Sequence, residues 1–154
     1  MGTHYKGSEK EIDALNSYVK LIRAAETVSS RINNSLTKKG LTESQFGILE
    51  ALYHLGPLCQ KDLGKKLLRS GGNITLVVDN LEKQGFVKRE RGESDRRYFT
   101  VHLTEKGTTL IEEIFPHQIK LIVEEMSVLS EKENAEFQAL CKKIGIKDLP
   151  DCNK

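Results

Sequence analysis

The sequence contains no tryptophan, only three cysteines and no long uninterrupted hydrophobic run. No apolar stretch approaches the roughly 18 residues that suggest a membrane-spanning helix, and no charged-then-apolar signal segment opens the chain. An odd number of cysteines without metal-ligand spacing argues against a disulfide framework and suits a reducing compartment. These absences predict a cytoplasmic protein that does not associate with a membrane.

Motifs for catalysis and for metal binding are also missing. The sequence has no phosphate-binding loop, no nucleophile elbow and no carboxylate pair at a defined spacing. None of its histidines has a metal partner at ligand spacing, and the least unlikely metal site would join His54 to His117 across two helices. We therefore expect no enzyme, no metal and no cofactor.

The sequence lacks a strong overall charge, because its formal net charge is only +2. The charge is nevertheless unevenly distributed. The stretch from Cys59 to Leu103 holds ten lysines and arginines against six aspartates and glutamates, a local charge of +4 that leaves −2 for the rest. A local basic excess is typical of a nucleic-acid contact, although a solvated charged surface explains this distribution equally well.

What the sequence does contain is a helix followed by a basic hairpin, between Ser70 and Leu103. Its first half has apolar residues at helical spacing, which predict one buried helix face: Ile74, Val77, Val78 and Leu81. Ser70 suits an N-cap and Gly85 suits a helix end. The second half alternates with a period of two, which predicts a strand that buries Phe99, Val101 and Leu103. A helix with a polar outer face and a basic hairpin can hold a duplex at two places.

Helix start and stop signals divide the rest of the chain. A long helix is expected from about Ser8 to Gly40, and capping boxes open further helices at Thr42 and Ser130. The helix after Thr42 is expected to direct Phe46, Leu49, Leu52 and Tyr53 inward. A short helix at 60–68 and a tight turn then lead into the helix at 71–84, which is the helix-turn-helix arrangement.

The terminal helices carry more apolar surface than one module of this size can cover. We therefore expect a two-fold homodimer, in which a second copy covers the excess. We expect a mainly α fold: a winged helix-turn-helix with a small antiparallel β wing. The chain 1–154 would form a single domain, in which 8–40 and 104–146 are dimerisation helices and 42–103 is the DNA-binding module.

Three motifs resemble the MarR family of winged helix-turn-helix transcription regulators. They are Ile74–Val87, which resembles the family's recognition helix, Asp95–Arg97 at the wing tip, and Val101–Gly107 entering the second dimerisation helix. The resemblance implies a homodimer that binds a pseudo-palindromic operator in double-stranded DNA. Members are commonly repressors, released by small phenolic or other organic effectors or by cysteine oxidation.

The recognition helix is expected to contact bases through side chains on its outer face: Asn73, Thr75, Leu76 and Asn80. Asparagine can pair with adenine in the major groove, and threonine or leucine can pack on a thymine methyl. Ser70, Gly71 and Gly72 lie where a helix N-terminus favours a phosphate, although the two glycines can also serve only to make the turn. Asp79 is expected to orient a neighbouring arginine and not to touch DNA.

The wing is expected to contribute the remaining DNA contacts. A salt bridge between Asp95 and Arg97 would stiffen its tip, while Arg96 or Arg91 would enter the minor groove. Lys88 and Arg89 are predicted phosphate contacts. A solvated charged hairpin is the alternative.

Aromatic and histidine side chains outside the DNA-binding module are candidates for an effector cavity: Tyr18, Phe46, Tyr53, His54 and His117. Core packing explains each of them equally well. Cys59, at a helix start, is either a small capping residue or a redox sensor; a cysteine enzyme would require it to be highly reactive. A helical dimer that uses its winged helix to bind a protein is the other alternative to a DNA-binding regulator.

Overall fold

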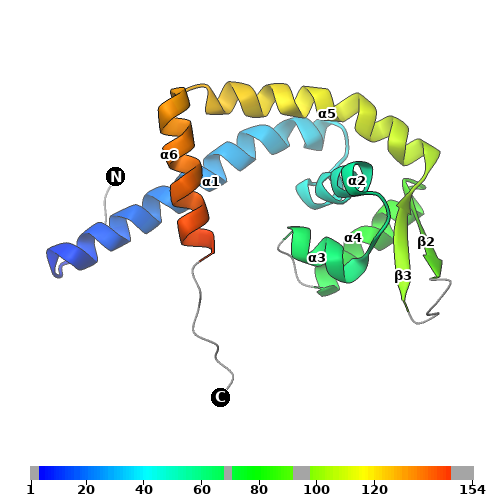
Figure 1. The fold of residues 1–154 in the computed structure, drawn as a ribbon, viewed down its shortest axis with the longest axis horizontal. Coiled ribbons are helices and arrows are strands. Elements are labelled where there is room, and N and C mark those ends of the chain that lie inside the picture. Colours follow the sequence, from blue (N-terminus) through cyan, green and yellow to red (C-terminus); the bar gives the residue numbers. More distant parts are fainter. Residues whose placement is uncertain (1–3, 68–70, 92–97, 147–154) are drawn as a thin grey trace, which may run out of the picture. The chain divides into compact units, whose positions relative to one another are not determined.

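The computed structural model describes residues 4–67, 71–91 and 98–146. Helices and a small sheet follow one another along the chain (Figure 1): α1 (Glu9–Lys38), α2 (Glu43–Leu55), β1 (Leu58–Cys59), α3 (Gln60–Leu67), α4 (Gly71–Lys83), β2 (Val87–Arg91), β3 (Phe99–Leu103), α5 (Glu105–Met126) and α6 (Glu131–Gly145). The predicted class, mainly α with a small antiparallel β wing, is confirmed. The chain divides into two compact units, Met1–Gln118 and Ile119–Lys154.

The predicted capping boxes are present. At the start of α2, Oγ1 of Thr42 accepts a hydrogen bond from the amide of Gln45 at 3.2 Å, and Oε1 of Gln45 accepts one from the amide of Thr42 at 2.9 Å. Ser130 and Glu133 form the same reciprocal pair at the start of α6. Each box satisfies two backbone donors that the first turn of a helix leaves without a partner.

The helix ends also follow the sequence signals. Gly40 after α1 and Gly85 after α4 have φ angles of +74° and +77°, a left-handed conformation that glycine adopts without steric cost. After α4, the amide of Phe86 donates to the carbonyl of Leu81 at 3.0 Å and the amide of Gly85 donates to that of Glu82 at 2.9 Å. This is the double hydrogen bond of a Schellman motif. It turns the chain directly from the recognition helix into β2.

The sheet has one strand more than the sequence predicts. Its order is β1-β3-β2, with all neighbours antiparallel. β2 and β3 form the expected hairpin, in which Val87 lies opposite Leu103 and Arg91 lies opposite Phe99. The additional strand β1 pairs Leu58 with Val101. It contains only two residues, which is too short to produce an alternating pattern in the sequence.

A tight corner joins the wing to α5. Oγ1 of Thr104 donates to the carbonyl of Gly85 at 2.6 Å and accepts from the amide of Gly107 at 3.1 Å, which caps α5. The ammonium group of Lys106 lies 4.6 Å from the centroid of the Phe86 ring. A Cβ atom on Gly107 would lie 2.0 Å from the carbonyl oxygen of Phe86, well inside van der Waals contact. Only glycine fits at this corner.

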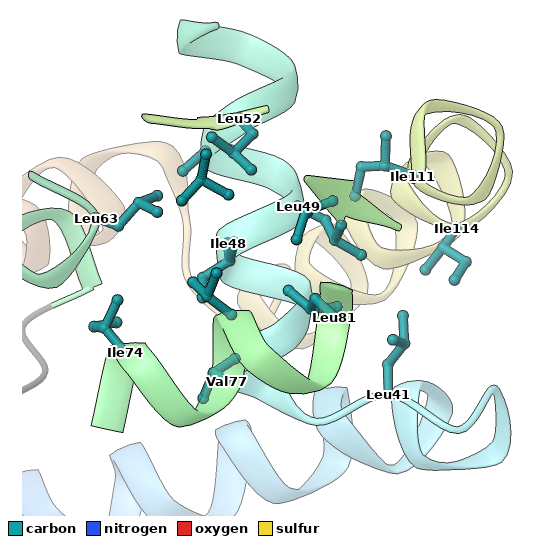
Figure 2. Close-up of a cluster of buried hydrophobic side chains, with 14 of the residues drawn as sticks. Leu41, Ile48, Leu49, Leu52, Leu63, Ile74, Val77, Leu81, Ile111 and Ile114 are labelled. Atoms are coloured by element: carbon teal, nitrogen blue, oxygen red, sulfur yellow. The ribbon is translucent and has the colours of Figure 1, made fainter. Parts of the chain in front are cut away.

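A single hydrophobic core joins α2, α3 and α4 to the sheet and to the near ends of α1 and α5. Figure 2 shows Ile48, Leu49 and Leu52 of α2 among the side chains contributed by the surrounding elements. The buried face of α4 consists of the four residues that its helical spacing predicts: Ile74, Val77, Val78 and Leu81. This burial determines which face of α4 remains exposed.

Two side chains that the sequence predicts to be buried are not. Tyr53 is 39% exposed, and its hydroxyl donates to Oε1 of Glu112 at 3.3 Å. Phe99 is 40% exposed, and its ring lies 5.5 Å from the guanidinium carbon of Arg91. Both residues are near the ends of their elements, where the core no longer covers both faces. The inward orientation predicted for them was therefore wrong.

The second unit contains the end of α5 from Ile119 and the whole of α6. None of the residues of α6 is buried. The apolar stripe that the sequence predicts there is exposed in the single chain, with Leu140 at 59% and Ile144 at 61%. In the ranges that the structure describes, no helix has the length and apolar character needed to cross a membrane.

Candidate DNA-binding site

The outer face of α4 presents the side chains that the sequence assigns to DNA. Asn73, Thr75, Leu76 and Asn80 are all exposed, and Leu76 is 61% exposed although it is apolar. Gly71 and Gly72 form the first two positions of the helix, whereas Ser70 lies outside the described residues. The predicted outward orientation is confirmed, and the DNA contacts themselves stay a prediction.

Behind this face, α4 is tied to the neighbouring elements by polar side chains. Nε2 of Gln60, the first residue of α3, donates to Oγ1 of Thr75 at 2.9 Å. The Oε1 atom of the same Gln60 accepts from Nε of Arg89 in β2 at 3.0 Å. One amide therefore links the helix before the turn, the recognition helix and the wing.

Arg89 makes its other contacts with acidic side chains of α4. Its Nη2 lies 2.5 Å from Oδ1 of Asp79 and its Nη1 lies 2.7 Å from Oε2 of Glu82. The Arg89 side chain is only 18% exposed. Asp79 thus orients an arginine as predicted. The guanidinium nitrogens of Arg89 are engaged inside the module, and the phosphate contact predicted for Arg89 stays a prediction.

The remaining cations of the described wing are more open. Nζ of Lys88 lies 2.6 Å from Oε1 of Glu90, and Nε2 of His102 lies 3.4 Å from Oε2 of the same carboxylate. The hydrogen bond from Lys88, followed by the charges of His102 and Lys88, lowers the pKa of Glu90 below its ordinary value. Arg91 is exposed and lies against Phe99. Asp95, Arg96 and Arg97 are outside the described residues, so their predicted roles are untested.

The candidate effector residues do not form one cavity. Phe115 of α5 brings two of them together, since the centroid of its ring lies 6.4 Å from that of Phe46 and 4.8 Å from that of His54. Tyr53 joins this aromatic group through His54, at 5.1 Å between centroids. Tyr18 is exposed on α1 and takes no part in these ring contacts.

His117 lines a separate cavity of about 360 Å³ between α1 and α5, with Ser35, Lys38, Lys39, Glu113, Ile114 and Gln118. Lys39 and Glu113 form an ion pair at 2.8 Å, which lowers the pKa of Glu113 through a hydrogen bond and the lysine charge. Gln118 is 1% exposed, and its Nε2 donates to Oγ of Ser35. Its Oε1 has no hydrogen-bond partner among the described residues.

Cys59 directly precedes α3 and is half-buried. Its Sγ donates to Oδ2 of Asp62 at 3.2 Å, a contact that spans the first turn of the helix. The contact is with a side chain and not with a backbone amide, so the capping and redox interpretations of Cys59 both stay predictions. Within the described ranges, no group of three or more histidine, cysteine, aspartate or glutamate side chains is arranged to hold a metal ion.

Two short helices separated by three residues, with an exposed second helix and a pair of antiparallel strands after it, define a winged helix-turn-helix protein. The MarR family model matches residues 41–99. The HTH-type transcriptional regulator MhqR of Bacillus subtilis is 36% identical over 133 residues, covering 86% of this chain and 92% of MhqR. The chain therefore belongs to the MarR family, and it is a DNA-binding transcription regulator and not an enzyme.

Solved structures agree with this assignment. MepR of Staphylococcus aureus, in complex with DNA, is 27% identical with a TM-score of 0.74, covering 83% of this chain and 94% of that chain. A cysteine-to-serine mutant of MarR from Escherichia coli, in complex with operator DNA, is 25% identical with a TM-score of 0.76, covering 90% and 99%. Both similarities extend beyond the segment that the family model matches.

Proposed function

We propose that two copies of this chain bind a pseudo-palindromic operator and repress transcription until a small organic molecule releases them. The observation that carries the proposal is the exposed face of α4, with Asn73, Thr75, Leu76 and Asn80 opposite a fully packed face. A helix anchored on one side and polar on the other suits insertion into the major groove. The related MepR and MarR proteins have been solved with DNA, which supports DNA binding by this chain.

Each group on this surface has a role in the proposal. Asn73 and Asn80 pair with base edges, and Leu76 packs on a thymine methyl. The amides of Gly71 and Gly72 at the start of α4 face a phosphate. Lys88 contacts the phosphate backbone of the DNA. Arg96 or Arg91 enters the minor groove from a hairpin whose tip is stiffened by a salt bridge between Asp95 and Arg97.

The two-fold symmetry of the proposed dimer sets the operator geometry. Each of the two compact units has exposed apolar side chains that a second copy would cover: Tyr18 and Ile22 on α1 in one, Leu140 and Ile144 on α6 in the other. The ranges 8–40 and 104–146 are the proposed dimerisation helices of a single 1–154 domain. The dimer would present two copies of α4 to half-sites about 10 base pairs apart, centre to centre.

Operator binding is tested by fluorescence anisotropy on DNA from the chain's own upstream region, beside a scrambled duplex, at two salt concentrations. We expect preferential binding that weakens steeply with salt, because phosphate contacts release counterions. Arg97→Ala should weaken binding to both duplexes without lowering the melting temperature. Equal, feeble binding to both duplexes would instead favour a protein partner for the winged helix, and normal binding by Arg97→Ala would contradict the role of the wing.

For the effector, we propose the cavity between α1 and α5. A buried amide oxygen without a donor, as at Gln118, favours a ligand that supplies a hydroxyl group. Lys38, which borders the same cavity, suits an anionic group on that ligand. A small hydroxylated aromatic acid combines the two features and fits the volume.

Comparing 4-hydroxybenzoate with benzoate tests the hydroxyl contact alone, because both compounds carry the carboxylate and benzoate lacks the hydroxyl donor. We expect 4-hydroxybenzoate to release DNA at about one fifth of the benzoate concentration, since one buried hydrogen bond contributes roughly 1 kcal/mol. In Gln118→Leu the two compounds should become equivalent, while DNA binding without ligand is retained. Equal release of the wild-type protein by both compounds would exclude the proposed contact with Gln118.

A further inference from the structure

We propose that Arg89 is a positioning residue that fastens the wing to the recognition helix and does not itself contact DNA. The inference rests on the DNA binding proposed above and concerns how the binding surface is held in shape. Arg89, Asp79, Glu82 and Gln60 are called the bracket below. Its members come from α3, α4 and β2, so it spans the elements on either side of the exposed helix face.

The geometry holds the backbone as well as the side chain. The amide of Arg89 donates to Oε1 of Glu82 at 3.0 Å, while Nη1 of the same residue donates to Oε2 at 2.7 Å. One carboxylate therefore binds both ends of the arginine. A two-point contact fixes the position of β2 along α4 in a way that a single flexible ion pair does not.

Burial identifies the arginine as the inner member of the bracket. The Arg89 side chain is 18% exposed, whereas those of Asp79 and Glu82 are more than twice as exposed. An arginine that contacts phosphate must extend its guanidinium towards solvent in the free protein. Here each of the nitrogens Nε, Nη1 and Nη2 already donates to Gln60, Glu82 or Asp79.

The bracket also explains two acidic residues on a DNA-facing helix. Isolated carboxylates on α4 would repel the phosphate backbone, because charges of like sign destabilise the complex. Pairing both carboxylates with one guanidinium neutralises half of that negative charge. The same two carboxylates hold Arg89, and with it β2, in position. Gln60 extends the bracket to the hydroxyl of Thr75, which is on the proposed base-contacting face.

The test is whether Asp79→Asn binds the operator more tightly or more weakly than the wild-type protein. Removal of a negative charge from a DNA-binding surface should by itself tighten binding. If Asp79 acts through the bracket, the variant should instead bind about tenfold more weakly, with an unchanged salt dependence. Glu90→Gln is the matched control, because it removes the same charge from β2 outside the bracket and should bind at least as tightly as wild type. Asp79→Glu, which restores the carboxylate, should recover most of the affinity.

Hydrogen exchange of the DNA-free proteins tests, independently of DNA binding, whether the bracket holds β2 in place. Asp79→Asn should accelerate hydrogen exchange of the amides of β2, including that of Arg89. The exchange rates of Glu90→Gln should stay close to those of the wild type, as should the melting temperatures of both variants. Tighter DNA binding by Asp79→Asn with a steeper salt dependence would show that a freed Arg89 contacts phosphate, and would overturn the inference. Unchanged exchange would overturn it as well. If the wild-type protein shows no operator preference, the proposed function fails, and the exchange result alone decides whether the bracket positions β2.

Discussion

Replacing Leu140 and Ile144 on α6 by aspartate is expected to give a monomer whose operator affinity is lower by about 100-fold or more. Both side chains are exposed in the single chain and lie on the apolar stripe of the helix. In the proposed dimer they would be buried against the second copy, where an unpaired charge is strongly unfavourable. A monomer engages only one half-site and loses the gain from linking two recognition helices.

The chain offers a matched control for this pair of changes. Ala135 and Ala139 are exposed and lie on the opposite side of α6 by helical spacing. Aspartates at these two positions add the same charge to the same helix and should leave a dimer that binds DNA. Sedimentation measures the oligomeric state, and circular dichroism checks that each variant is folded. A dimeric Leu140→Asp, Ile144→Asp variant with wild-type affinity would remove α6 from the interface.

Gly107→Ala is expected to lower the free energy of unfolding by about 3 kcal/mol, at the upper end of the usual cost of overpacking. Glycine to alanine inside a helix ordinarily stabilises by up to about 1 kcal/mol, so the predicted change has the opposite sign. The reason is the backbone carbonyl of Phe86, which the new methyl group would meet at 2.0 Å. Backbone cannot rotate away as a flexible side chain does, so the corner between β3 and α5 must open.

Gly145→Ala in α6 is the control for Gly107→Ala. Among the described residues, an added Cβ there would have no neighbour within 4 Å, so this substitution should be neutral or slightly stabilising. Urea denaturation of the two variants beside the wild-type protein measures both effects. Equal stability of Gly107→Ala and Gly145→Ala would contradict the steric account of the corner.

The sequence predicted the helix boundaries well because their signals are local. Thr42 and Gln45 satisfy each other's amides three residues apart, and Gly85 ends α4 through contacts within five residues. The buried face of α4 was predictable for the same reason, since helical spacing places its apolar residues together. The two-residue strand β1 left no periodic pattern and became visible only through its pairing with β3.

Charged side chains were harder to place than apolar ones. The sequence suggested that Asp79 would orient an arginine, but several arginines were within reach, and Arg89 was assigned to phosphate. The structure selects Arg89 because β2 returns along α4 after the turn at Gly85. Similarly, Phe46 and His54 meet Phe115 of α5, far away in the sequence, whereas His117 lines a cavity that includes neither of them.

The sequence by itself thus determined the family, the order of helices and the outward face of the recognition helix, because these depend on short-range spacing and on motifs read in order. The tertiary structure alone decided which cation is bound internally, which candidate effector residues contact one another, and why Gly107 must be glycine. Those features depend on distances between segments remote in the chain. A long side chain with several donors can satisfy any acceptor it reaches, and only the packed fold determines which acceptors lie within its reach.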